Sequence, residues 1–138
     1  MVTESCTKYD DGPLISLRSA KERVTGTWEV ESLTADGNDS TQALKGQPCY
    51  AKIVLIDFGT WSMATYPECG TIGSWQFDKN CKHIYIVAEH FANSSIRLVG
   101  PFLNANQINW NIKRLSNKQL WIETDYENIH WQVHLNKD

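Results

Sequence analysis

One stretch near the C-terminus decides the fold: residues 107–135 have the sequence QINWNIKRLSNKQLWIETDYENIHWQVHL. Ile108, Trp110 and Ile112 alternate there with Asn109 and Asn111, and residues 129–135 alternate in the same way. A period of two is typical of β-strands that bury one face. Polar turns at 116–118 and 127–128 divide the stretch into three predicted strands, at 107–115, 119–126 and 129–135, joined by hairpins.

The same pattern extends back to Gly26, with aromatic and β-branched residues between turn residues. It predicts five more strands, at 27–34, 50–58, 60–66, 71–77 and 83–89. A polar turn cluster follows the first of them at 35–40, and a loop continues to Pro48. The connection around Gly59 is so short that only a tight antiparallel hairpin fits it.

Eight short-linked strands with one apolar face favour closure into an up-and-down antiparallel β-barrel, because closure removes the exposed sheet edges. A β-sandwich is the alternative, but only segments 36–47 and 93–106 are long enough for its crossing connections. Ser19 and Glu22 form a candidate capping box that predicts a short helical turn at 19–24. We therefore expect a tether at 1–18 and an all-β barrel domain at 19–138.

Composition excludes several classes of protein. The 138 residues include 41% hydrophobic residues, which is typical of a globular chain, and carry a net charge of −3. Lys and Arg form no basic block, so we expect no nucleic-acid partner. The sequence also contains no run of about 18 apolar residues, the length that a membrane-spanning helix requires.

The motif GTWEV at 26–30 places a Gly-x-Trp at the start of the first predicted strand, after a helical turn. This pattern resembles the lipocalins, and more closely the lipocalin-like lipoproteins of Gram-negative bacteria. Further similarity lies in DDGP at 10–13, SLRS at 16–19, DG at 36–37 and Thr41. The closing strands add five similar positions: Trp110, Ile112, Leu115, Leu120 and Trp121.

The resemblance implies structural roles for three residues. In lipocalins, the Trp of the Gly-x-Trp motif plugs the closed end of the barrel, so Gly26 and Trp28 are expected there. An Arg from a late strand packs across that Trp, and Arg114 is the candidate here. A guanidinium can stack on an indole while its hydrogen bonds hold the helical turn. The later short motifs of the better-known lipocalins have no convincing counterpart in this sequence.

The resemblance also implies a location. Ser5-Cys6 followed by a polar segment looks like the start of a mature bacterial lipoprotein, in which the cysteine carries lipid. We therefore expect lipidation at Cys6 and an exported protein, held in the outer membrane or at the cell surface only through this lipid, with a periplasmic location as the alternative. An ordinary cysteine on a frayed N-terminal tail is the other interpretation.

The remaining cysteines suggest one disulfide. Cys49 and Cys69 each lie ten residues from Gly59, so a hairpin centred there brings them nearly opposite one another. Cys81 falls at the far end of the strand that begins near Thr71, too far from Cys69 to pair in this register. We expect a bond between Cys49 and Cys69, and a Cys81 that is unpaired, or joined to Cys6 where that residue carries no lipid.

A barrel of eight strands can be filled by side chains or can hold one small ligand. The six tryptophans favour a ligand site slightly, because aromatic rings line apolar pockets. The candidate lining residues for a small apolar or amphipathic ligand are Trp61, Met63, Trp75, Phe77, Trp110 and Trp131. For each tryptophan taken singly, a role in the core is the simpler interpretation.

Other functions have less support in the sequence. The spacing of Cys and His matches no metal-binding motif, and no nucleophile motif or phosphate loop is present, so we expect no metal, no cofactor and no catalytic residue. Glu123 and Asp125 share one strand face, but a solvated outer face explains them more simply than a catalytic pair. The main alternative is a solid barrel that binds an envelope protein through the surface rings Tyr50, Tyr66 and Trp121.

Overall fold

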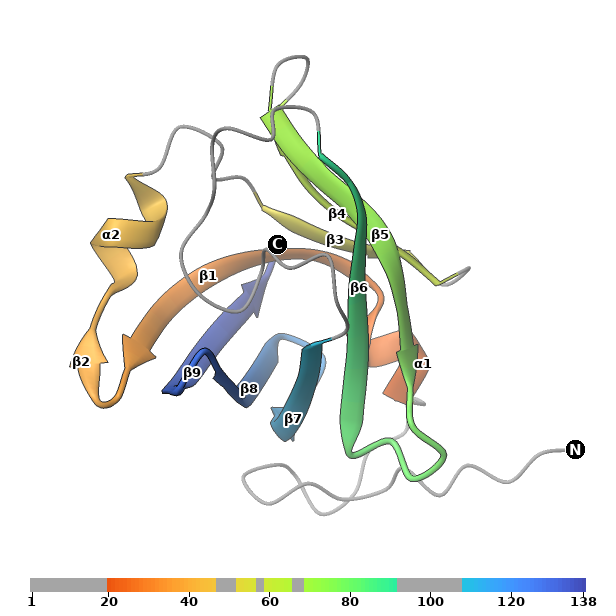
Figure 1. The fold of residues 1–138 in the computed structure, drawn as a ribbon. Coiled ribbons are helices and arrows are strands. Elements are labelled where there is room, and N and C mark those ends of the chain that lie inside the picture. The colour runs from red at the N-terminus through yellow and green to blue at the C-terminus, as the bar shows by residue number, and fades with distance from the viewer. Residues whose placement is uncertain (1–19, 47–51, 57–58, 66–68, 92–107) are drawn as a thin grey trace, which may run out of the picture.

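The computed structural model describes residues 20–46, 52–56, 59–65, 69–91 and 108–138 (Figure 1). Two short helices and nine strands lie in these ranges. Their bounds are α1 (Ala20–Val24), β1 (Gly26–Ala35), β2 (Asn38–Asp39), α2 (Thr41–Lys45), β3 (Ile53–Ile56), β4 (Thr60–Thr65), β5 (Cys69–Phe77), β6 (His83–Phe91), β7 (Ile108–Leu115), β8 (Gln119–Tyr126) and β9 (Ile129–Lys137). The predicted tether lies outside the described residues, as do the side chains of 63–65, 69–71 and 88–91.

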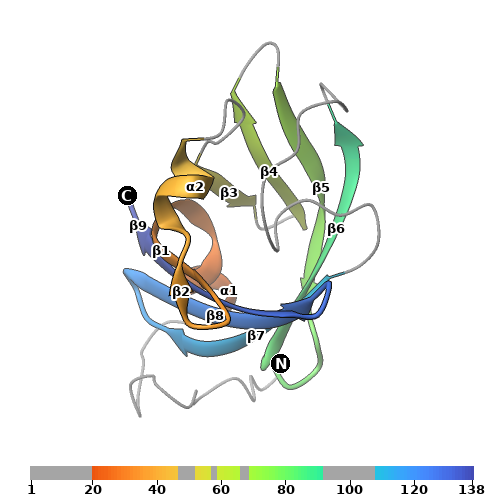
Figure 2. The same cartoon turned by 60° about the vertical axis from the view of Figure 1, so that its left-hand side comes forward.

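Strands β1 and β3 to β9 form a closed antiparallel barrel of eight strands, in which sequence neighbours are also spatial neighbours. The barrel closes where β1 pairs with β9, from Trp28 opposite Lys137 to Ala35 opposite Trp131. Figure 2 shows the strands arranged around a ring. The barrel and its eight strands were predicted from the sequence, and its closure excludes the β-sandwich. Neither helix within the described ranges has the length and apolar character needed to cross a membrane.

Two elements near the end of β1 were missed by the sequence analysis. Asp36 and Gly37 have φ values of 49° and 83°, the conformation of a type I′ hairpin turn, which brings the short strand β2 back onto β1. The segment predicted as a loop then forms α2 beside β1. Thr41 holds this arrangement, because it accepts a hydrogen bond from the Leu33 N–H and donates its hydroxyl to Asp39.

The inner face of the barrel follows the predicted alternation. On β7, Ile108, Trp110 and Ile112 are buried, whereas Asn109 and Asn111 are exposed. On β9, Trp131 and Val133 are buried in the same way. The largest buried side chains, with essentially no exposed surface, include three indoles, those of Trp28, Trp61 and Trp110.

A β-bulge interrupts the alternation near the end of β7. Ile112 pairs with Ile122, but the next paired residue is Arg114, opposite Trp121. The extra residue in β7 reverses the parity of the strand, so Leu115 is buried in the core and Arg114 lies on the outside. This reversal decides the position of Arg114 relative to the barrel end.

Candidate binding site

The barrel end next to α1 is sealed by a network of side chains from α1, β1 and β9. Trp28 donates its indole N–H to the Val24 carbonyl (2.8 Å), which joins β1 to α1. The buried Arg23 donates its guanidinium to the Leu115 carbonyl at the end of β7 (2.8 Å). Lys137 donates to the Arg23 carbonyl (2.6 Å), with its ammonium 5.0 Å from the Trp28 ring centroid. These bonds hold the helical turn across the barrel end.

The cation over Trp28 is therefore Lys137, and the prediction of Arg114 for this position was wrong. The β7 bulge turns Arg114 outward, where its guanidinium carbon lies 5.4 Å from the ring centroid of Trp121. Gly26 lies at the sealed end, as expected. Its φ of 142° favours glycine, and a Cβ there would lie 3.2 Å from Lys137 Cε.

The candidate ligand-lining rings lie in the barrel interior. Trp61, Trp75, Trp110 and Trp131 are all buried, with Trp131 the most exposed of them at 7%. Phe77 is partly buried and meets Trp75 edge to face, with ring centroids 5.5 Å apart. The Met63 side chain lies outside the described residues. The assignment of these rings to a ligand stays a prediction.

Two of these indoles reach across a neighbouring strand to a backbone carbonyl. Trp61 on β4 donates to the Val87 carbonyl on β6 (2.9 Å), and Trp75 on β5 donates to the Ile56 carbonyl on β3 (2.9 Å). Trp61 passes over β5 at Gly73, where an added Cβ would lie 2.6 Å from the indole nitrogen. The absence of a side chain at Gly73 is thus what allows this crossing.

A separate pocket of about 390 Å³ lies in the barrel wall where β7 and β8 part. The paired register of these strands runs from Leu115 opposite Leu120 to Asn111 opposite Glu123. Beyond Asn111, β7 pairs with β6 as far as Ile108, while β8 pairs with β9 as far as Tyr126. Six mostly outward-facing polar residues line this β7–β8 wall pocket: His83, Asn109, Asn111, Glu123, Asp125 and His130.

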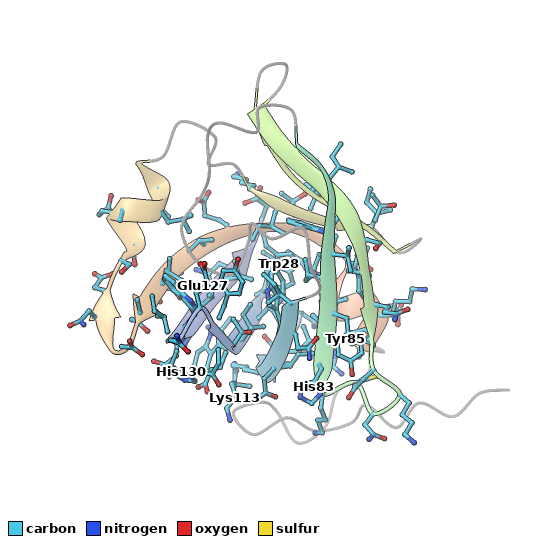
Figure 3. The ribbon with its side chains drawn as sticks, viewed as in Figure 1. Trp28, His83, Tyr85, Lys113, Glu127 and His130 are labelled. Carbon is cyan, nitrogen blue, oxygen red and sulfur yellow. The ribbon has the colours of Figure 1, made fainter. Side chains whose placement is uncertain are left out.

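Ile108, Thr124 and Tyr126 complete the lining of the wall pocket. Ile108 and Thr124 belong to the buried face of their strands, with exposures of 4% and 7%. Residues of both faces therefore meet in the pocket, at the place where the two strands part. Figure 3 shows His83 and His130 on either side of β7 and β8, with Trp28 inside the barrel.

The His130 ring joins the two carboxylates of the wall pocket. Its Nδ1 lies 2.8 Å from Asp125 Oδ1, and its Nε2 lies 3.3 Å from Glu123 Oε1. The hydrogen bond with Asp125 is the main reason why the pKa of His130 is raised above its usual value, and the nearby charge of Glu123 adds to it. Gln132 donates to the other Glu123 oxygen (3.1 Å) and so holds this carboxylate from β9.

His83 is held on the opposite side of the pocket. Its Nδ1 lies 2.9 Å from Asp78 Oδ2, and its ring stacks nearly parallel to Tyr85 with centroids 6.4 Å apart. Partial burial raises the pKa of Asp78, but hydrogen bonds from the His83 ring and from the backbone N–H groups of Lys82 and His83 outweigh it and lower the pKa overall. Both histidines are thus oriented by carboxylates.

Cys81 is disulfide-bonded, so the expectation of an unpaired Cys81 was wrong, and the alternative of a bond to Cys6 stays a prediction. Its partner is one of the three cysteines whose side chains are not described. Cys69 begins β5 and Cys81 lies beyond the other end of that strand, at Phe77. Eight residue steps of about 3.3 Å place Cys69 and Phe77 roughly 26 Å apart. The turn in which the Cys81 N–H donates to the Asp78 carbonyl keeps Cys81 at the Phe77 end, so a bond between Cys69 and Cys81 is excluded. The proposed pair of Cys49 and Cys69 falls on side chains outside the described residues.

Within the described ranges, no group of three His, Cys, Asp or Glu side chains is placed to hold a metal ion. The wall pocket itself was not predicted from the sequence. Its one signal in the sequence was that Glu123 and Asp125 share a strand face, which we assigned to solvated surface. The separation of β7 from β8 depends on strand register and twist, and no local sequence pattern indicates it.

The chain matches no protein-family model and no curated protein by sequence. Its structure is similar to that of a lipocalin-like protein from Bacteroides uniformis, with a TM-score of 0.56 and 14% sequence identity. The similarity covers 84% of this chain and 99% of the other. At this identity the comparison establishes the fold, which is a lipocalin-like barrel.

Proposed function

We propose that this protein is a non-enzymatic binding protein that holds a small hydrophobic or amphipathic molecule in its barrel. The observation that carries the proposal is the closed barrel sealed at one end by Arg23, Trp28 and Lys137. A ligand would then enter at the opposite end, where Trp131 pairs with Ala35.

Native mass spectrometry of the freshly purified protein tests this proposal. A discrete small apolar molecule should leave with unfolding and be identified after organic extraction. Oleate and the neutral monooleoylglycerol then serve as defined probes, followed by tryptophan fluorescence. An empty spectrum together with no fluorescence change for either probe would contradict ligand binding in the barrel.

Two tryptophans on adjacent strands provide a matched pair of variants. Trp131 on β9 is 7% exposed and faces the interior, whereas Trp121 on β8 lies on the outer face, stacked on His134 with ring centroids 4.1 Å apart. Trp131→Ala should weaken probe binding because it removes a ring from the proposed chamber. Trp121→Ala should leave probe binding unchanged. The urea midpoint of each variant checks that it folds.

The outer stack supports the alternative function, a barrel that binds an envelope protein. Trp121 lies between His134 and Arg114, and its indole N–H is buried with no hydrogen-bond partner among the described residues. Trp and Arg are the residue types most enriched at the energetic centres of interfaces. The same two variants separate the functions, because a protein partner would be released by Trp121→Ala and retained by Trp131→Ala. Tyr50 and Tyr66 lie outside the described residues.

We also propose that the protein is exported, as a component of the outer membrane, the cell surface or the periplasm. The disulfide of Cys81 supports an oxidising compartment, because disulfides persist there and are rare in the cytosol. Lipid on Cys6 remains part of this proposal. A lipid thioether and a Cys6–Cys81 disulfide exclude each other, because both use the Cys6 sulfur.

Non-reducing peptide mapping of the protein from its native membrane decides the state of Cys6. A diacylglyceryl mass on the Cys6 peptide, with Cys81 bonded to Cys49 in place of the expected Cys49–Cys69 pair, would support the lipid anchor. A Cys6–Cys81 peptide would contradict the anchor while leaving export in place.

A further inference from the structure

The β7–β8 wall pocket combines contributions from four neighbouring strands. His83 comes from β6, Asn109 and Asn111 from β7, Glu123 and Asp125 from β8, and His130 from β9. Its volume of about 390 Å³ falls within the range of roughly 300–1,000 Å³ that is usual for small-molecule sites. Most of its lining belongs to the outer face of the wall, and Ile108 and Thr124 extend it to the inner face.

The Glu123 and His130 side of the wall pocket is fixed before any ligand arrives. Glu123 is held by His130 and Gln132, and Gln132 accepts a hydrogen bond from the Thr34 hydroxyl on β1 (3.1 Å). The His130 backbone N–H donates to the Asp36 carboxylate (2.9 Å). Side chains that are already oriented lose little entropy on binding, which favours affinity for a small ligand.

Both donors and acceptors face the wall pocket. Each carboxylate can accept about four hydrogen bonds, and Asp125, whose side chain is 83% exposed, accepts one from His130 among the described residues. The Asn111 side chain makes no hydrogen bond within the described ranges, and its amide offers two donors and one acceptor oxygen. A Tyr126 ring at the border adds an apolar surface.

This combination decides which ligand charge fits. An anion would be repelled by Glu123 and Asp125, and no Lys or Arg is found among the described residues that line the pocket. A cation would have to compete with His130, which already engages one oxygen of each carboxylate. A neutral hydroxyl group can donate to a carboxylate and accept from an amide at the same time.

We propose that the β7–β8 wall pocket binds a neutral pyranose sugar, whose hydroxyl groups bridge the carboxylates of Glu123 and Asp125 and the amide of Asn111. The apolar face of the sugar ring packs on Tyr126. The proposal for this site does not require a ligand inside the barrel. The pocket is open to solvent on the outside of the wall, so it accepts either a free hexose or one unit of a longer glycan.

Heteronuclear NMR of the intact protein tests the proposal. The probes are glucose, galactose and mannose, with glucuronate and glucosamine as charged analogues of glucose, and maltotriose as a short glycan. At least one neutral sugar should produce saturable shifts of the Asn109 and Asn111 side-chain amides, with glucuronate and glucosamine at least tenfold weaker. Shifts with free hexoses indicate a monosaccharide site, whereas shifts with maltotriose alone indicate a glycan unit. No saturable shift with any neutral probe, or a preference for either charged analogue, would overturn the proposal.

Glu123→Gln and Glu31→Gln form a matched pair of variants for the same titration. Both replace a carboxylate by an isosteric amide, but Glu31 is an exposed residue of β1 that does not line the pocket. Loss of a charged hydrogen-bond acceptor should weaken sugar binding roughly tenfold in Glu123→Gln and leave Glu31→Gln unchanged. Equal affinity in both variants would overturn the assigned role of Glu123. Ligand binding in the barrel is followed separately by tryptophan fluorescence. A failure of the barrel-ligand proposal is therefore distinguished from a failure of the sugar-site proposal.

Discussion

Replacing Gly73 by Ala perturbs the crossing of Trp61 over β5. A Cβ at position 73 would lie 1.8 Å from the Val87 carbonyl oxygen and 2.6 Å from the indole nitrogen of Trp61. Both distances are far below van der Waals contact. The Val87 oxygen belongs to the backbone of β6, so it cannot move without displacing that strand. The indole would have to give up its hydrogen bond to the same oxygen.

The expected cost combines two terms. Overpacking of a buried site costs about 1–3 kcal/mol. Loss of the hydrogen bond from Trp61 to Val87 adds about 0.5–1.5 kcal/mol. Gly73→Ala should therefore lower the free energy of unfolding by about 2–4 kcal/mol, which for a domain of this size lowers Tm by roughly 10 °C.

Urea unfolding followed by tryptophan fluorescence and far-ultraviolet circular dichroism measures this loss. Gln76→Ala is the control, because Gln76 is an exposed residue of the same strand and its loss should cost no more than about 0.5 kcal/mol. In a Trp61→Phe background, which lacks the indole N–H, Gly73→Ala should cost less than in the wild type. A Gly73→Ala variant within about 0.5 kcal/mol of the wild type would refute the proposed crossing.

Three further predictions concern the sealed end, the wall pocket and the disulfide. Lys137→Met should lower the free energy of unfolding by about 1–3 kcal/mol, because it removes a charged hydrogen bond and a cation–π contact. Arg114→Met is the control and should leave the sealed end intact. Equal losses of stability in urea unfolding of the two variants would contradict this prediction. An NMR titration should give His130 a pKa above the usual value of about 6.5, and a lower pKa in Asp125→Asn. Because the folded-state pKa is raised, the stabilisation from this pair is complete below about pH 6.5 and is lost as the pH rises through the raised pKa; an unchanged pKa in the variant would exclude the assigned hydrogen bond. Alkylation under non-reducing conditions should leave Cys81 unmodified, and a labelled Cys81 would contradict its disulfide.

The extent of successful prediction is clearest on β7. The alternation of Ile108, Trp110 and Ile112 with polar residues correctly gave the strand, its buried face and its part in a barrel. One extra residue at the bulge then reversed the parity, so Arg114 lies on the outer face and not across Trp28, where it was predicted. A bulge depends on the pairing of two strands, so a rule applied to one strand at a time could not find it.

The prediction for the segment after β1 was wrong for a different reason. The polar residues at 35–40 correctly indicated a turn, but α2 was assigned to a loop. Its helix is only five residues long, so its intrinsic propensity is weak. A contact with β1 supports it, since the Thr41 hydroxyl accepts a hydrogen bond from the Leu33 N–H, and a local bond joins Thr41 to Asp39. Hydrogen bonds from the Thr41 hydroxyl and backbone N–H lower the pKa of Asp39.

The hydrogen bonds of the buried indoles weaken the argument from aromatic composition to ligand binding. Trp61, Trp75 and Trp131 each donate to a backbone carbonyl, on β6, β3 and β8 respectively. A large ring that spans neighbouring strands and hydrogen-bonds to their backbone stabilises a closed barrel without any ligand. The number of tryptophans is therefore explained in part by the barrel itself.

The case for a ligand chamber then depends on Trp131, nearest the end opposite α1. Trp131→Phe keeps most of the ring but loses the bond to Tyr126, whereas Trp131→Ala loses both. Probe binding that survives the first change and fails with the second would show that the ring itself contacts the ligand.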